Sequence, residues 1–129
     1  MPASGFWRSG PVFLGEKLFL EAVTTGITAF AGGGQTSATA LSASSSVHVL
    51  STVASAADSV KLPTTYKGAL VFVRNGGANS ANVFPQSSGT GGTIDGGSAN
   101  AAKAVAAGVG TIFYLAAVAS DGTQTWVTF

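Results

Sequence analysis

Residues 68–85 carry the strongest local folding signal in the chain, GALVFVRNGGANSANVFP. Side chains alternate between the two faces of an extended segment, so Leu70 and Phe72 share one face and Val71 lies on the other. The Asn-Gly-Gly sequence that follows tolerates the positive φ angles of a tight reversal. A second apolar run then ends at Pro85, which cannot donate a hydrogen bond to a central strand. The pattern predicts a β-hairpin in the core of an all-β domain.

The rest of the chain repeats this pattern of short strands between glycine-rich turns. Further strands are expected at residues 27–31, 35–41, 46–53, 58–62, 93–95, 111–118 and 123–129. Asp121-Gly122 predicts a hairpin turn between the last two of these strands. Residues 101–106 fit either one helical turn or a strand leading into an Ala107-Gly108 turn, and we favour the strand. Strands at a spacing of about 8–12 residues are typical of a β-sandwich or jelly roll of short antiparallel strands. No internal repeat covers the chain, which argues against a solenoid or propeller.

The first 23 residues differ from the remainder and predict an extended N-terminal arm (1–23) ahead of a single β-sandwich domain (24–129). Glycines and prolines interrupt the arm, yet it holds four of the chain's twelve aromatic residues. Its aromatics could fill the core of their own domain, or they could dock on a neighbouring subunit or another protein. The candidate protein-contact residues of the arm are Phe6, Trp7, Arg8, Phe13 and Phe19.

Charge is scarce in a chain of single-domain length. Only 9% of its 129 residues are Asp, Glu, Lys or Arg, against roughly a quarter in ordinary soluble domains. Such a surface suits a membrane protein or a subunit buried in a permanent assembly. The longest uncharged apolar run, residues 104–120, contains glycines and is better explained by strands than by a spanning helix. A net charge of +1 provides no basic field for nucleic acid, so neither a membrane nor nucleic acid is an expected partner.

The residues needed for catalysis or metal binding are almost absent from the sequence. There is one histidine, His48, and no cysteine, so a zinc site is excluded and a nucleophile would have one possible base. Asp58, Asp95 and Asp121 each stand alone beside a turn, where aspartate usually bonds to backbone. Arg74 fits a strand-end charge at a turn or interface. No enzyme activity, cofactor or metal is expected.

Aromatic residues could also form a platform on which a sugar stacks. The candidates for such a platform are Trp7, Tyr66, Tyr114 and Trp126. Such a platform also needs nearby carboxylates and amides, and a tryptophan in an alternating strand pattern, such as Trp126, is more often a residue of the core.

Three segments, ADSVKLP (57–63), GALVFVRNGGANSANVFP (68–85) and TIDGGSANAAKAVAAGVGTIFYLAA (93–117), precede the late Trp126. Together they resemble small β-rich structural proteins of tailed-bacteriophage virions, including head decoration (cement) proteins. The resemblance implies a jelly-roll or sandwich domain that forms a homo-oligomer, with a trimer favoured over a dimer. It further implies binding over joints between major capsid protein subunits, on the outer surface of the virion, after synthesis in the host cytoplasm. The resemblance carries no catalytic residues.

Two functions of different classes follow from these observations. The first is capsid decoration and stabilisation, with the arm as the contact to capsid or to neighbouring copies. The alternative is a tail-fibre or appendage module that recognises a cell-surface carbohydrate.

Overall fold

The structure is a computed structural model that describes residues 12–14, 17–20 and 22–129. Within these residues every regular element is a β-strand, which confirms the expected all-β class. The strands are β1 (Val12–Leu14), β2 (Lys17–Phe19), β3 (Val23–Thr28), β4 (Thr39–Ala40), β5 (Val47–Thr52), β6 (Ser59–Lys61), β7 (Leu70–Asn75), β8 (Ala81–Phe84), β9 (Thr93–Ile94), β10 (Lys103–Val105), β11 (Gly110–Val118) and β12 (Gln124–Thr128).

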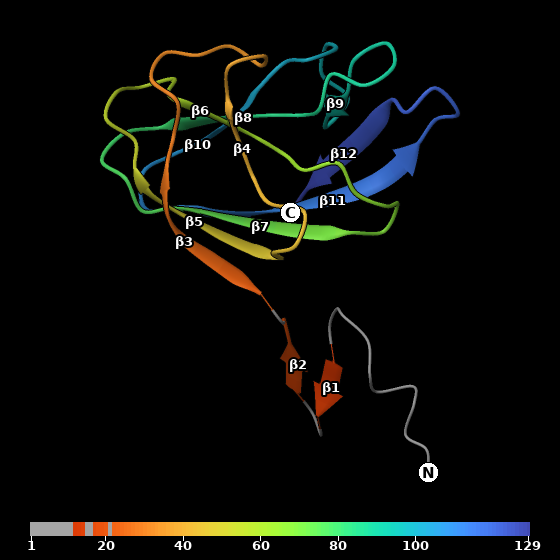
Figure 1. Cartoon of the computed structure of the whole chain (residues 1–129), viewed down its shortest axis with the longest axis horizontal. Helices are drawn as coiled ribbons and strands as arrows, with labels where there is room; N and C mark the ends of the chain where they lie inside the picture. Colours follow the sequence, from red (N-terminus) through yellow and green to blue (C-terminus); the bar gives the residue numbers. More distant parts are fainter. Residues whose placement is uncertain (1–11, 15–16, 21) are drawn as a thin grey trace.

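The strands form two large sheets and one small one. A six-stranded sheet has the order β3-β5-β7-β11-β12-β9, and a four-stranded sheet has the order β10-β8-β6-β4. Figure 1 shows the four-stranded sheet above the six-stranded one. β1 and β2 pair only with each other in an antiparallel two-stranded sheet, which Figure 1 shows beyond the start of β3 and outside the two stacked sheets.

From β3 to β8 the chain winds back and forth between the two large sheets. β3, β5 and β7 are parallel neighbours in one sheet, and β4, β6 and β8 are parallel neighbours in the other. Val23 pairs with Val47, which in turn pairs with Phe72, so each turn returns to the same place after about 25 residues. The expectation of antiparallel strands is therefore wrong for β3–β8, although β8, β10, β11 and β12 do form antiparallel pairs.

The predicted hairpin at residues 68–85 is also wrong, because its two strands belong to different sheets. β7 pairs with β5 and β11, whereas β8 pairs with β6 and β10. The Asn-Gly-Gly segment carries the chain from one sheet to the other. Gly77 is needed there for space: a Cβ atom on it would lie 2.6 Å from the backbone nitrogen of Val53. Glycine is therefore required at this position because another backbone segment approaches it closely, and not because the chain makes a two-residue turn there.

The other two glycine turns have different outcomes. The Asp121-Gly122 turn joins β11 to β12 as an antiparallel hairpin, with Gly122 at a φ of 90°, and this prediction is confirmed. Residues 103–105 form a strand, as favoured. The chain then reverses at Gly108, but β10 lies in the four-stranded sheet and β11 in the six-stranded sheet. The two strands around Ala107-Gly108 are therefore not a hairpin.

A single apolar core lies between the two large sheets. Its members, all buried, are Ala29, Leu41, Leu50, Val53, Val60, Leu62, Val71, Val73, Ala81, Val83, Ile94, Val105, Phe113, Leu115 and Trp126. Both sheets contribute to it through alternate residues of their strands. Trp126 has no exposed surface, which confirms the expectation that it belongs to the core. A sugar could not stack on this ring in the folded chain.

Candidate assembly surface

The outward side of the six-stranded sheet is apolar, although it faces away from the core. Val71 and Val73 of β7 are buried, so the alternate residues Leu70 and Phe72 lie on the opposite side. Strand register aligns five outward residues in a row across the sheet: Val23, Val47, Phe72, Ile112 and Phe129. Five adjacent strands thus present an unbroken apolar row.

A second row lies beside the first. Leu70 pairs with Tyr114, and Tyr114 pairs with Val127. The rings of Tyr114 and Phe129 meet edge to face, with their centroids 6.5 Å apart, an arrangement that aromatic pairs favour. Phe129 is 77% exposed and Val23 57%. We call these eight residues the outer face: Val23, Val47, Leu70, Phe72, Ile112, Tyr114, Val127 and Phe129.

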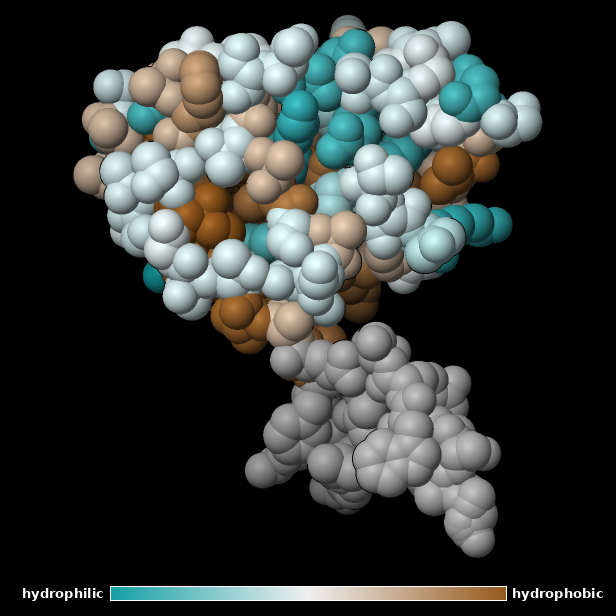
Figure 2. All heavy atoms as spheres, in the orientation of Figure 1, coloured by the Kyte–Doolittle hydropathy of each residue, from teal (hydrophilic) through white to brown (hydrophobic). Residues whose placement is uncertain are grey.

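Charge is nearly absent from the outer face. A third row aligns Val49, Arg74 and Gly110 along its margin. The guanidinium of Arg74 donates a hydrogen bond to the carbonyl of Gly108, so it is held at that margin, as expected for a strand-end charge. Figure 2 shows hydrophobic atoms, in brown, along the lower edge of the body, where Figure 1 places this sheet.

The four-stranded sheet differs on its outward side. Lys61 of β6 and Asn82 of β8 occupy polar positions there that alternate with buried valines, beside one apolar residue, Phe84. A sheet with one face in water normally alternates apolar and polar residues in this way. The six-stranded sheet departs from that rule, because its outward side is apolar as well as its inward side.

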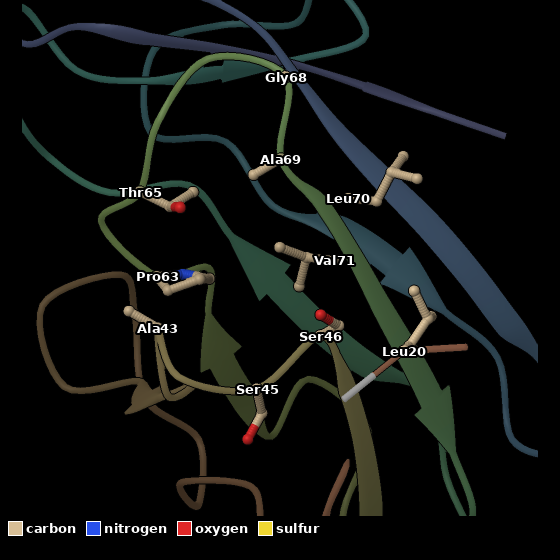
Figure 3. A pocket seen from close by; sticks show the side chains of 10 residues that line it. All are labelled: Leu20, Ala43, Ser45, Ser46, Pro63, Thr65, Gly68, Ala69, Leu70 and Val71. Carbon is tan, nitrogen blue, oxygen red and sulfur yellow. The ribbon is translucent and has the colours of Figure 1, made fainter. Parts of the chain in front are cut away.

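A pocket of about 240 Å³ opens at the starting ends of β5 and β7. Figure 3 shows Leu20 and Leu70 on one side of it and Ala43 and Pro63 on the other. Its polar side chains are the hydroxyls of Ser45, Ser46 and Thr65, and none of its lining residues within the described part of the chain is ionisable. The apolar part of the lining suits a small apolar group. It adjoins the outer face through Leu70.

The structure places the predicted arm residues only in part. Phe6, Trp7 and Arg8 lie outside the described residues. Phe13 lies in β1 and Phe19 in β2, where backbone pairing sets Phe13 opposite Leu18 and Phe19 opposite Val12. The register therefore does not pair the two aromatics with each other, and their assignment as contact residues stays a prediction.

His48 is a buried residue on the inward side of β5. It has no exposed surface, and its Nε2 lies 3.0 Å from the carbonyl oxygen of Ser42. Its Nδ1 has no hydrogen-bond partner among the residues that the structure describes. Across the part of the chain that the structure describes, no three His, Asp or Glu side chains come together as metal ligands.

The three aspartates bond to nearby backbone, as the sequence predicts. Asp58 is buried and accepts hydrogen bonds from the backbone N–H groups of Gly32 and Ser55, each at 3.0 Å. These bonds lower the pKa of Asp58. Asp95 joins Lys103 in an ion pair at 2.8 Å and accepts two bonds from Thr128, which lower its pKa. Bonds from Thr123 lower the pKa of Asp121.

These lowered pKa values predict a loss of stability in acid. A carboxyl group whose folded pKa is depressed stabilises the fold above its ordinary value of about 3.9, and this contribution disappears as the pH falls through the folded pKa. Wild-type protein should therefore need less urea to unfold at pH 3 than at pH 7. Asp58→Asn should be less stable at pH 7 and should lose less on acidification. Equal urea midpoints for wild type and Asp58→Asn at both pH values would contradict the role of Asp58.

The outer face was not identified from the sequence, although a signal for it exists. In residues 70–73 and 112–115 both alternating sets of positions are apolar. A strand with one side in water would carry polar residues in one of these sets. The uninterrupted apolar runs are therefore typical of strands that are buried on both sides of their sheet.

Comparisons with protein-family models, curated proteins and solved structures found no match to this chain. Among the described residues, no helix is long and apolar enough to span a membrane.

Proposed function

We propose that this chain is a non-enzymatic structural protein of a phage virion that decorates and stabilises the capsid. The outer face is the observation that carries this proposal. Eight apolar side chains lie in register on the side of the sheet that faces away from the core, and Val23, Leu70 and Phe129 among them are exposed. Monomers rarely expose a contiguous apolar patch of this kind. Such a surface favours a protein that functions as part of a larger assembly. The sequence resemblance to head decoration proteins indicates the kind of assembly.

The arrangement of the body supports a sandwich-type fold in preference to a jelly roll. Two sheets lie one above the other and share one core. A jelly roll consists of antiparallel strands in two Greek keys, whereas β3–β8 pair in parallel within each sheet.

The N-terminal arm is the part that we assign to the capsid. β1 and β2 form their own two-stranded sheet, and an isolated two-stranded hairpin is marginally stable in water. Docking on the major capsid protein, across a joint between its subunits, would stabilise the hairpin. The contact residues in this proposal are Phe6, Trp7, Arg8, Phe13 and Phe19.

Capsid binding by the full chain tests the proposal. Empty heads of the phage that encodes the chain, prepared without it, would be mixed with the purified protein and sedimented. We expect the full chain to sediment with the heads and to raise the temperature at which they disassemble. A variant lacking residues 2–14 should do neither. Failure of the full chain to bind the heads would refute the capsid role, and undiminished binding by the shortened chain would refute the role of the arm.

A further inference from the structure

We propose that the pocket at the starting ends of β5 and β7 binds an uncharged small molecule, one that carries an apolar ring and a single hydroxyl or carbonyl group. The site does not depend on the proposed capsid role, because it needs no contact with another protein. Val71 lines the pocket and also belongs to the buried core. A molecule held there would therefore contact the core of the domain directly.

Two hydroxyl groups give the pocket its polar part. Ser46 and Thr65 are half-buried, and their hydroxyls make no hydrogen bond within the described residues. The third hydroxyl, that of Ser45, is already bonded to the hydroxyl of Thr24 at 2.5 Å. Figure 3 shows the hydroxyls of Ser46 and Thr65 turned toward the interior of the pocket and the hydroxyl of Ser45 turned away from it. Ser46 and Thr65 can therefore each donate to, or accept from, a polar group of a ligand.

The pocket selects against charge. Apart from the three hydroxyl-bearing residues and Gly68, its lining is apolar, and no ionisable residue is among the described residues that form it. Moving a carboxylate or ammonium group from water into such a site is strongly unfavourable unless the group is paired. A sugar ring also fits poorly, because most of its hydroxyls would lose hydration against side chains such as Leu20 and Leu70.

The volume of the pocket fits one substituted ring. It is about 240 Å³, whereas an apolar cavity of about 150 Å³ is enough to bind benzene. A six-membered ring with one or two small substituents would therefore fill it.

Backbone hydrogen bonds hold both walls of the pocket in place. On one side, the N–H of Ser46 donates to the carbonyl of Ala22 at 3.0 Å, and the carbonyl of Ser46 accepts from the N–H of Phe72 at 2.8 Å. On the other side, the N–H of Gly68 donates to the carbonyl of Leu115 at 2.8 Å. The site is thus formed before a ligand arrives, so little binding energy is lost in ordering it.

A titration of the full chain, followed by methyl NMR, tests the inference with three probes that share a methylphenyl ring. The phenol p-cresol should shift the methyl signals of Leu20, Leu70 and Val71, with a dissociation constant of about 0.1–1 mM. Toluene lacks the hydroxyl and should bind at least about 5-fold more weakly. The carboxylate p-toluate should leave these signals unshifted, because its charge would be buried without a partner.

Three variants assign the binding to the pocket. Ala43→Trp should abolish it, because Ala43 lines the pocket and is exposed in a turn, so the fold should tolerate a larger ring there. Ala107→Trp changes another exposed turn alanine, near the far end of β7, and should bind p-cresol like wild type. Thr65→Val should weaken p-cresol binding but not toluene binding.

Several results would overturn the inference. They are the absence of a saturable shift with p-cresol, equal affinities for the three probes, and undiminished binding by Ala43→Trp. N-Acetyltyrosinamide carries the p-cresol ring on a peptide backbone and should bind more weakly, because its amides would lie against Leu20 and Leu70. Tighter binding of this compound than of p-cresol would mean that the pocket receives a side chain of a protein, and would also overturn the inference.

Discussion

Replacement of Asn75 by aspartate should lower the free energy of unfolding by about 3–5 kcal/mol at neutral pH. Asn75 is fully buried at the end of β7. Its amide donates to the carbonyl oxygens of Asn79 and Val105, both at 2.8 Å, and its side-chain oxygen accepts from the N–H of Gly77 at 3.0 Å. An aspartate would place a carboxylate oxygen against two carbonyl oxygens in a site that water does not reach.

The loss of stability in Asn75→Asp should depend on pH, whereas a loss caused only by poorer packing would not. A protonated aspartic acid can donate one hydrogen bond, so burial beside carbonyls should raise its pKa. The variant should then recover part of its stability as the pH is lowered toward 5. Asn82→Asp is the matched control, because the side chain of Asn82 is only half-buried and makes no hydrogen bond within the described residues. Urea denaturation should show a change of less than about 1 kcal/mol for this control. Similar losses in both variants would show that Asn75 does not hold the sheets together.

Truncation of Trp126 to alanine should lower the free energy of unfolding by about 3–5 kcal/mol. The side chain has no exposed surface, and its strand pairs with both β11 and β9, through Leu115 and Ile94. Removing the indole leaves a large cavity in the core. It also removes the Nε1 donor that lies 3.1 Å from Oε1 of Gln124, so a buried acceptor loses its partner.

Tyr66→Ala is the control for the Trp126 variant. Tyr66 is 88% exposed, so its truncation should change stability by less than about 0.5 kcal/mol. All variants should be compared at one protein concentration, because any self-association would make the apparent stability concentration-dependent. A Trp126→Ala protein that unfolds at the same urea concentration as Tyr66→Ala would contradict the observed core.

Local patterns in the sequence predicted strands well and their partners poorly. Alternation placed β5, β7, β11 and β12 close to their observed positions. The Asp121-Gly122 turn joins neighbouring strands of one sheet, so its local chemistry was enough to predict the pairing. The parallel winding of β3–β8 is different, because each strand pairs with one about 25 residues away. No short-range signal reports such a pairing, and different apolar residues fill equivalent positions, so no sequence repeat reveals it.

The glycines at positions 76 and 77 show why the hairpin prediction failed. Glycine serves both where φ must be positive and where another backbone approaches closely. At Gly77 the second reason applies, because the backbone nitrogen of Val53 lies only 2.6 Å from the position of a Cβ atom. Sequence alone does not distinguish these two uses. The outer face was missed for a related reason: whether an apolar strand is covered on both sides depends on sheet order, which the sequence did not provide.

Hydroxyl-radical footprinting of the wild-type protein, free and bound to phage heads, tests the role of the outer face most directly. Oxidation of each side chain would be compared between the free chain and the head-bound chain, with Phe30 as an internal control. Phe30 is 48% exposed and bridges to β6, away from the outer face. We expect Phe72, Tyr114 and Phe129 to become protected on assembly while Phe30 oxidises equally in both states. Equal oxidation of Phe129 in the free and the head-bound chain would contradict burial of the outer face.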